Sequence, residues 1–429
     1  MIVAFFIKLL KEVSKLSNER VLIIGVQLQK NTEEHFNSTI EELKSLSETA
    51  GGEVIDVITQ KSERIHSATY IGKGKVDEVA EIVDSEEIDL VVCNDELSPS
   101  QLRNLNDQLE VRIIDRSQLI LDIFARRADT KEGKLQVELA QLQYMLPRLH
   151  GMGTILSRLG GGIGTRGPGE TKLETDQRHI RRRIDDIKAR LKDVVKQRDQ
   201  YRERRKLNRT FQIAIVGYTN AGKSTIFNRL TDEDSLEEDL LFATLDPLTR
   251  KITLPSGFET LITDTVGFLQ DLPTTLIAAF KSTLEEVGEA DLIIHVVDVT
   301  HEDKQQQQET VISILKDLDA TNVPILTVYN KRDKLTEDFI PTNHPYALIS
   351  AYNNQDLDNL LEQVENEIKN DWEYFTIYLD PSEGKVMHQI ERETIIDESK
   401  FDSEKNKYYL AGYIRQDHPI QGVIKEKRE

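Results

Sequence analysis

Gly217-Tyr218-Thr219-Asn220-Ala221-Gly222-Lys223-Ser224 decides the fold, because this stretch fits the phosphate-loop pattern G-x-x-x-x-G-K-[ST] at every position. A β-branched run over 212–216 precedes it, and a helical pattern follows from Ser224-Thr225. The amides of such a loop and the N-terminus of the next helix surround phosphate oxygens. The stretch therefore predicts a nucleotide triphosphate site, in which Lys223 reaches the β- and γ-phosphates and Ser224 binds Mg²⁺.

A second motif, Asn330-Lys331-Arg332-Asp333, predicts that the base is guanine. It follows the apolar run 325–329, at the end of an expected strand. The carboxylate of Asp333 can accept hydrogen bonds from the ring N–H and the exocyclic amine of guanine, a donor pair that adenine lacks. Ser350-Ala351, after the strand-like run 346–349, suits the last base-contacting loop, where a backbone amide would meet the guanine oxygen.

Two further segments complete the expected site. Asp264-Thr265-Val266-Gly267 follows the strand-like run 260–263, with Asp264 as the outer-sphere Mg²⁺ carboxylate and the Gly267 amide placed to sense the γ-phosphate. Phe242-Ala243-Thr244 lies between the phosphate loop and Asp264, and Thr244 is the candidate hydroxyl that closes over Mg²⁺. The alternative for Thr244 is an ordinary solvated loop residue.

The residues around the γ-phosphate predict slow hydrolysis. Phe268 follows Gly267, where many GTPases have a Gln that orients the attacking water, and a phenyl ring cannot do so. A partner is therefore expected to accelerate turnover. Asn220 is a candidate for holding K⁺ near the developing charge, and Lys223, Thr244, Gly267 and Asn220 form the expected catalytic set. The alternative for Asn220 is a side chain that only stabilises its own loop.

The order of these motifs is that of Ras-like GTPases, and the chain resembles the HflX family of ribosome-associated GTPases within the translation-factor-related class. The resemblance rests on Gly217–Ser224, Phe242–Pro247, Asp264–Phe268 and Asn330–Asp333. It extends to Tyr70–Lys75 and to a Gly-rich loop described below, and covers about residues 20–371. The resemblance implies a GTPase that binds the large ribosomal subunit and separates stalled or idle ribosomes into subunits.

Composition and charge fit a soluble protein of about three domains in 429 residues, with a net charge of −20. Cys93 stands alone inside an apolar run, so it is expected to be a buried thiol in a reducing cytosol. The apolar start of the chain is interrupted by Lys8 and is too short to span a bilayer. A cytoplasmic location is expected, with peripheral membrane contact as an alternative.

The expected fold is α/β throughout. A leader (1–19) precedes a small parallel α/β domain (20–130), whose strand-like runs are 21–24, 54–58, 88–92 and 111–114. A helical hairpin (131–209), a Ras-like G domain (210–371) and a small α/β C-terminal domain (372–429) follow. Tyr70–Lys75 is expected to be a basic loop that opens a helix and touches RNA, or else a plain turn.

Two apolar series with alternating steps of three and four predict that the hairpin is an antiparallel coiled coil. The series are Leu135, Leu139, Leu142, Leu146, Leu149 and Leu173, Gln177, Ile180, Ile184, Ile187, Leu191, Val194. The connecting loop over 150–171 is rich in Gly and Arg. It could thread a groove in rRNA, or be a flexible linker. The resemblance to the family favours rRNA.

The second hairpin helix is basic in an acidic chain. Residues 178–209 hold fourteen Lys and Arg against five Asp and Glu, a net charge of +9 (14 − 5). Such a segment is usually a solvated helix face, yet here it concentrates any attraction to phosphates on one element. A local contact with large-subunit rRNA is expected, and no binding to DNA. The protein is expected to be a monomer. The alternatives are a checkpoint factor in large-subunit assembly and a GTPase switch that acts on a protein partner.

Overall fold

The fold is seen in a computed structural model that describes residues 19–158, 168–207, 210–231, 242, 244–270, 286–318, 320–336 and 338–427. The chain forms two compact units. The first contains residues 1–199, 239–246 and 269–282, and the second contains 200–238, 247–268 and 283–429. The leader 1–19 of the sequence analysis lies, apart from residue 19, outside the described residues.

The N-terminal α/β domain has four parallel strands in the order β2-β1-β3-β4, which confirms the four predicted strands. The strands are β1 (Arg20–Leu28), β2 (Glu53–Ser62), β3 (Leu90–Cys93) and β4 (Arg112–Asp115). The helices are α2 (Glu33–Thr49), α3 (Lys73–Ser85), α4 (Pro99–Leu109) and α5 (Arg116–Arg127). Cys93 is fully buried in this core, as predicted.

Local sequence explains where these helices begin. Ser98 caps α4 in a capping box with Gln101, and Pro99 occupies the first turn, where its missing N–H costs nothing. Gly72 is the N-cap of α3, so the basic stretch after Tyr70 does open a helix. Lys73 and Gly74 are exposed there, and contact with RNA stays a prediction.

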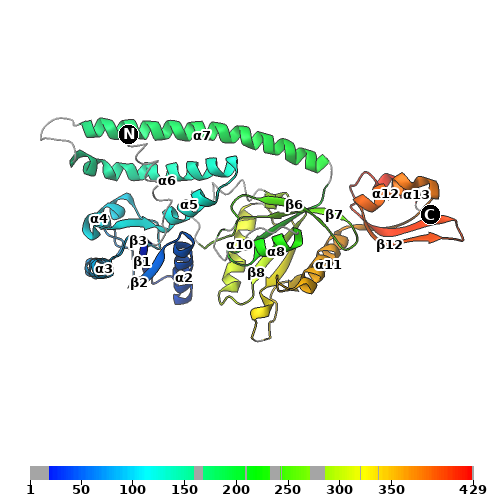
Figure 1. The fold of residues 1–429 in the computed structure, drawn as a ribbon, viewed down its shortest axis with the longest axis horizontal. Helices are drawn as coiled ribbons and strands as arrows, with labels where there is room; N and C mark the ends of the chain where they lie inside the picture. The colour runs from blue at the N-terminus through cyan, green and yellow to red at the C-terminus, as the bar shows by residue number, and fades with distance from the viewer. Residues whose placement is uncertain are drawn as a thin grey trace. The chain divides into compact units, whose positions relative to one another are not determined.

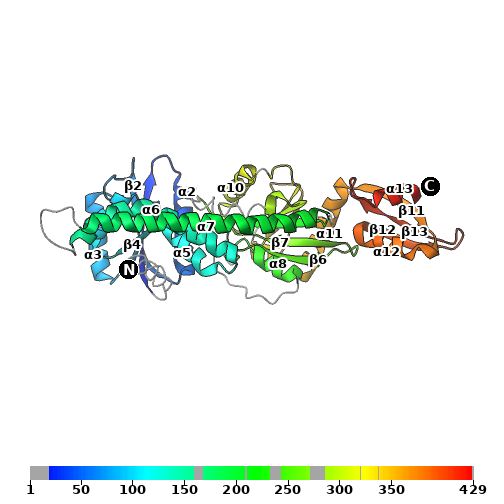
Figure 2. The same cartoon turned by 90° about the horizontal axis from the view of Figure 1, so that it is seen from above.

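The hairpin consists of α6 (Lys131–Arg158) and α7 (Pro168–Leu207), which run side by side in Figures 1 and 2. Leu149, Ile180 and Ile184 are buried in its seam, as the heptad pattern predicted. Ion pairs add to the seam, with Arg183 on Glu138 at 2.7 Å and Arg198 on Glu132 at 2.8 Å. Both helices extend into the predicted loop 150–171, and residues 159–167 lie outside the described residues.

Helix α6 is fixed to the α/β domain by one arginine. Arg148 donates to the carbonyl oxygen of Leu97 at 2.9 Å and to Oδ2 of Asp115 at 3.2 Å. Asp115 is buried, and burial raises the pKa of its carboxyl group. The guanidinium also stacks over the ring of Tyr144, 3.5 Å from its centroid. The hairpin up to residue 199 belongs to the same unit as the α/β domain.

The second unit is built on a six-stranded sheet in the order β10-β9-β8-β5-β7-β6, parallel except for the β6–β7 pair. Its strands are β5 (Gln212–Gly217), β6 (Leu248–Thr253), β7 (Glu259–Asp264), β8 (Leu292–Asp298), β9 (Ile325–Asn330) and β10 (Tyr346–Leu348). Helices α8 (Lys223–Thr231), α10 (Lys304–Asp317) and α11 (Asn354–Asp371) accompany it (Figure 1). Parallel strands place their carboxyl ends, and the motifs that follow them, at one edge.

The C-terminal part of the same unit is a three-stranded antiparallel sheet in the order β11-β13-β12 (Figure 2). Its elements are β11 (Glu373–Leu379), α12 (Gly384–Glu393), β12 (Ile395–Asp402), β13 (Lys407–Ile414) and α13 (Gln421–Lys427). A separate apolar cluster holds it together, including Phe375, Ile390 and Ile424. Strands and helices both occur here, as expected for a small α/β domain over 372–429.

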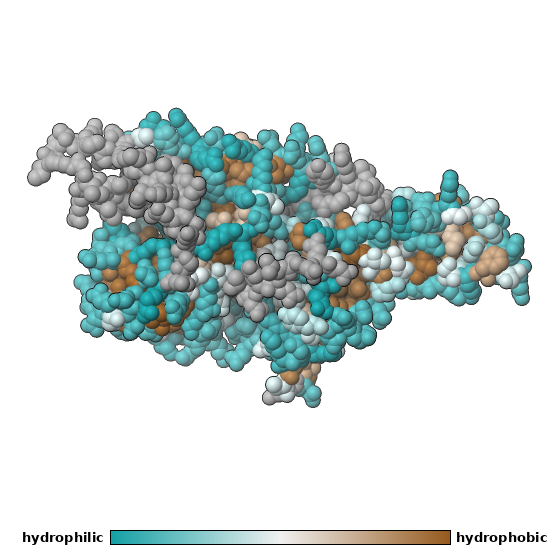
Figure 3. All heavy atoms as spheres, viewed as in Figure 1, coloured by the Kyte–Doolittle hydropathy of each residue, from teal (hydrophilic) through white to brown (hydrophobic). Residues whose placement is uncertain are grey.

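The surface agrees with the acidic, strongly charged composition. Hydrophilic residues cover most of the face drawn in Figure 3, and hydrophobic residues are scattered among them. Across the helices that the structure describes, none is both long enough and apolar enough to cross a membrane.

Candidate functional site

The phosphate loop lies between β5 and α8, so the predicted order of strand, loop and helix is confirmed. Gly217 has φ +152°, and a Cβ there would lie 2.2 Å from the carbonyl oxygen of Val296. Gly222 has φ +94°, and a Cβ there would lie 2.2 Å from Nδ2 of Asn330. Only glycine fits both positions, because the backbone is left-handed and the neighbours are close.

Lys223 is buried at the start of α8, and its ammonium group donates to the carbonyl oxygen of Tyr218 at 2.8 Å. Burial lowers its pKa to about 8, although the carboxylate of Asp264 acts in the opposite direction. The lysine is therefore held against the loop that it is predicted to serve. Thr225 follows it, half-buried in the first turn of the helix.

Two of the three predicted Mg²⁺ ligands are brought together. Oγ of Ser224 donates to Oδ2 of Asp264 at 2.8 Å, and Asp264 is 1% exposed at the end of β7. Oxygen donors of this kind suit Mg²⁺, which also takes phosphate and water oxygens. No cluster of three or more His, Cys, Asp or Glu that could hold a metal occurs among the described residues. A site shared with phosphates is consistent with that finding.

The third predicted ligand, Thr244, belongs to the first compact unit, where it is half-buried. Its neighbour Phe242 is buried with φ +58°, a strained conformation for a bulky residue. Ala243 lies outside the described residues. The roles of Phe242, Ala243 and Thr244 in nucleotide binding stay predictions.

Phe268 is hydrogen-bonded to the phosphate loop through its backbone, and Gly267 precedes it. The amide of Thr219 donates to the carbonyl oxygen of Phe268 at 2.9 Å, and the amide of Phe268 donates to Gly217 at 3.1 Å. A Cβ on Gly267 would lie 3.0 Å from Nζ of Lys223, so the Gly267 backbone passes beside that lysine. The ring of Phe268 is 1% exposed and belongs to the core. It offers no group to a water molecule.

The neighbours of Gly267 support this segment. The hydroxyl of Thr265 donates to the carbonyl oxygen of Ile215 in β5 at 2.6 Å, and Val266 is buried. In the phosphate loop itself, Asn220 is exposed with φ +59°, a left-handed conformation that Asn tolerates better than most residues. The side chain of Asn220 is thus open to a cation, and the use of K⁺ stays a prediction.

Asn330 connects the phosphate loop to the expected base loop. Its Nδ2 donates to the carbonyl oxygen of Ala221 at 2.9 Å, and its Oδ1 accepts from the amide of Ala351 at 3.0 Å. The amide of Ser350 donates to Asp356 at 2.7 Å. The amides of Ser350 and Ala351 therefore hold the loop in place in this structure, and their contact with a guanine oxygen is untested.

Lys331 and Asp333 lie on the turn after β9. Lys331 has φ +67° and forms an ion pair with Asp298 at 2.7 Å, which contributes to lowering the pKa of Asp298. Asp333 is exposed on the short 3-10 helix Arg332–Lys334. An exposed carboxylate at this position is accessible to a base.

Three residues near these loops were missed by sequence reasoning. Asp298 could have been found, because it ends an apolar strand at the same sheet edge as Asp264. Asp356, which also pairs with Arg332 at 2.9 Å, looks like any helix-surface acid in the sequence. His295 is 1% exposed in β8, and burial together with the charge of Lys223 lowers its pKa to about 4. It is neutral at physiological pH.

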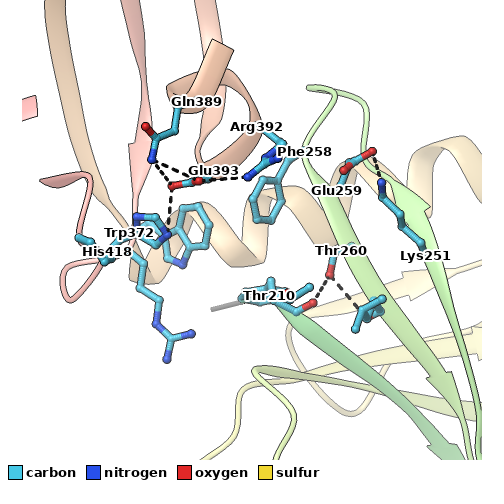
Figure 4. Close-up of a pocket in the computed structure, with 14 residues that line it drawn as sticks. Thr210, Lys251, Phe258, Glu259, Thr260, Trp372, Gln389, Arg392, Glu393 and His418 are labelled. Carbon is cyan, nitrogen blue, oxygen red and sulfur yellow. Dashed lines mark hydrogen bonds and ion pairs between the residues drawn. The ribbon is translucent and has the colours of Figure 1, made fainter. Parts of the chain in front are cut away.

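A cavity of about 680 Å³ lies elsewhere in the second unit (Figure 4). Thr210, Phe211 and Thr260 line it at the start of β5 and β7, away from the carboxyl ends where the motifs lie. Trp372 and Phe258 pack there with ring centroids 5.4 Å apart. Within the lining, Glu393 accepts hydrogen bonds from Gln389 and Arg392, and Nε2 of His418 lies 3.8 Å from its carboxylate. This cavity is separate from the nucleotide loops.

Comparisons with known proteins agree with the site geometry. Models for a GTP-binding GTPase N-terminal region, a GTP-binding GTPase middle region and a 50S ribosome-binding GTPase match residues 37–125, 127–205 and 212–331. GTPase HflX of Alkalihalophilus pseudofirmus is 51% identical over 419 residues, 97% of this chain and 99% of the relative. The chain belongs to the HflX family of GTPases.

Other HflX relatives are similar over most of their length. GTPase HflX of Caldanaerobacter subterraneus subsp. tengcongensis is 50% identical over 387 residues, 90% of this chain and 89% of the relative. That of Escherichia coli is 44% identical over 362 residues, 83% of this chain and 85% of the relative. The predicted α/β class, the P-loop GTPase domain and the GTPase activity of an HflX-family protein are thereby confirmed.

Proposed function

We propose that this HflX-family GTPase binds the large ribosomal subunit in its GTP state and separates stalled or idle ribosomes into subunits. The observation that carries the proposal is the hairpin, a two-helix arm that Arg148 joins to the α/β domain. Between residues 181 and 192, its helix α7 exposes the basic residues Arg181, Arg182, Lys188, Arg190 and Lys192. The matching family model for residues 212–331 is described as a 50S ribosome-binding GTPase, which supports the same partner.

The proposed domain boundaries are those of the sequence analysis, with the arm over 131–209. Its basic helix would meet rRNA phosphates, and the stretch between α6 and α7 would reach into the RNA. Because the rest of the chain is acidic, contact would be confined to this arm and sensitive to salt. A cytoplasmic location is proposed from the single cysteine of the chain, and a monomer is proposed as the oligomeric state.

Within the nucleotide site, loop amides and Lys223 would bind the phosphates, and Asp333 would accept from the guanine base. Ser224, Asp264 and Thr244 would hold Mg²⁺, which neutralises charge on the β- and γ-phosphate oxygens when bound. The amide of Gly267, beside Lys223, would donate to the γ-phosphate. Since Phe268 is buried, no side chain at that position orients water, and turnover is expected to be slow until the ribosome orders the site.

Sucrose-gradient sedimentation tests the ribosomal function. Ribosomes incubated with the protein and a non-hydrolysable GTP analogue are expected to sediment as free subunits, and with GDP as intact particles. Binding only to precursor particles would favour an assembly checkpoint instead. No binding to any ribosomal particle would favour a switch that acts on a protein partner, and would overturn the proposal.

Charge reversal tests the RNA contact. The double variant Arg181→Glu, Arg182→Glu is expected to weaken ribosome binding and to reduce the slope of log K against log salt by about two, one unit for each lost phosphate contact. Lys30→Glu with Arg64→Glu is the matched control, because both residues are exposed on the α/β domain of the same unit. Equal effects of the two double variants would contradict a contact through α7.

Substitution of Asp333 tests the base assignment. Asp333→Asn presents an amide donor where the carboxylate accepted, so preference is expected to move from guanine towards xanthine nucleotides. Competition binding with GDP and XDP measures this preference. An unchanged preference would remove Asp333 from the base contact.

A further inference from the structure

Asp246 makes three hydrogen bonds at the start of helix α6. Its carboxylate accepts from the amide of Asp129 at 2.9 Å, from the amide of Thr130 at 2.8 Å, and from the hydroxyl of Thr130 at 2.6 Å. All three residues belong to the first compact unit. A carboxylate is stabilised there because the first amides of a helix have no partner within the helix and carry partial positive charge.

The start of α6 is shaped for this contact. Thr130 is itself the cap of the helix, since its hydroxyl accepts from the amide of Gly133 at 2.9 Å. A Cβ on Gly133 would lie 2.3 Å from Oδ1 of Asp246. Glycine in a first helical turn is otherwise unfavourable compared with alanine, so its presence is explained by the close approach of Asp246.

A second anchor lies four residues before Asp246. The ring of Phe242 meets the ring of Phe124 in α5 edge to face, with centroids 4.5 Å apart. Phe242 is 3% exposed and keeps the left-handed φ of +58°. A bulky residue holds that conformation only when its surroundings fix it. Phe242 and Asp246 are therefore both anchored in the first unit, and Thr244 lies between them in the sequence.

We propose that Asp246 is a positioning residue for Thr244, and that the start of α6 and the Mg²⁺-bound triphosphate stabilise the same conformation of this segment. The inference rests on the proposed role of Thr244. Two residues span at most about 7 Å of chain, so fixing Asp246 restricts where the Thr244 hydroxyl can lie. If the bonds of Asp246 to α6 order this segment, triphosphate binding loses less conformational entropy. The coupling is reciprocal, so triphosphate binding would in turn favour the bonds of Asp246.

Hydrogen exchange with nucleotide titrations tests the inference. In the unmodified protein, the amides of Asp129 and Thr130 are expected to exchange more slowly with a non-hydrolysable GTP analogue and Mg²⁺ than with GDP. Asp246→Ala is expected to abolish that difference. It is also expected to lower the ratio of analogue affinity to GDP affinity by about five- to tenfold, the low end of ordinary coupling.

Three other variants separate positioning from a general structural role. Gly133→Ala should reproduce the lower affinity ratio although alanine favours the helix, because its methyl group displaces the carboxylate. Asp246→Asn keeps a side-chain carbonyl that accepts from the two amides, and should restore part of the ratio. Asp107→Ala removes an exposed carboxylate on α4 and is expected to keep the ratio of the unmodified protein.

The results that would overturn the inference differ from those that would overturn the proposed function. If the two amides exchange alike in both nucleotide states, or if Asp246→Ala keeps the original affinity ratio, Asp246 does not position Thr244. The assignment as a GTPase is unaffected in that case. If the unmodified protein binds neither GDP nor the analogue, the nucleotide site itself is refuted.

Discussion

Replacing Asn330 with alanine should destabilise the second unit more than an ordinary Asn→Ala change. The side chain is 2% exposed and bonds both the carbonyl oxygen of Ala221 and the amide of Ala351. Both of those residues are also buried. Alanine would therefore leave a buried acceptor in the phosphate loop and a buried donor in the base loop without their partner.

The cost follows from those two groups. Each unsatisfied buried group costs about 1–3 kcal/mol, so the variant is expected to lose about 2–6 kcal/mol of unfolding free energy. The whole free energy of unfolding of a typical domain is only about 5–15 kcal/mol. With a urea dependence of about 2 kcal/mol per molar, the unfolding midpoint should fall by about 1–3 M.

Trp372 gives a direct assay, because it is the only tryptophan in the chain. It packs against Phe211 and Phe258, with ring centroids 6.0 and 5.4 Å away, so its fluorescence reports unfolding of the second unit. Asn343→Ala is the matched control, since Asn343 is exposed and bonds Gln308 at 2.7 Å. Asn343→Ala is expected to lower the free energy of unfolding by less than about 1 kcal/mol. Equal midpoints for the two variants would refute the bridging role of Asn330.

Three other changes have defined outcomes. Phe268→Gln should not speed basal hydrolysis, because position 268 faces the core. It should lower the melting temperature, because it buries a polar amide. Faster turnover in a phosphate-release assay would contradict this prediction. Burial raises the pKa of Asp122 to about 7, so its contribution to stability is complete below pH 4 and is lost as the pH rises towards 7. In urea titrations at several pH values, the free energy of unfolding should fall with pH by up to about 1.4 kcal/mol per pH unit because of this residue. Asp122→Asn should remove that dependence. Ile187→Ala, at a fully buried seam position, should cost about 2–5 kcal/mol, and a loss below 1 kcal/mol by circular dichroism would contradict the seam.

The phosphate loop and the hairpin could be predicted from the sequence because their signals are local. Gly217 and Gly222 are needed for backbone conformations within one loop, so residue identity alone marks them. The seam residues Ile180, Ile184 and Ile187 recur with the helical period, and their burial follows from that spacing. In both cases, a short stretch of consecutive residues is enough to predict the local structure.

Other contacts could not be predicted because they join residues far apart in the chain. Asp356 accepts from the amide of Ser350 and pairs with Arg332, yet in the sequence it is one acid among seventy-five. Asp246 lies 116 positions from Thr130, and no periodicity relates them. The amides of Ser350 and Ala351 were expected to be open to the base, and their protein partners depend on tertiary structure.

Helix α6 connects the features of the first unit because it is a single continuous element. Its start contacts Asp246, Arg148 contacts the α/β domain, and the residues from Leu139 to Leu149 form the seam with α7. Its 28 residues extend about 42 Å at the rise of an α-helix. Arg148 contacts a carbonyl and a buried carboxylate, so the helix cannot shift at one end without disturbing that site.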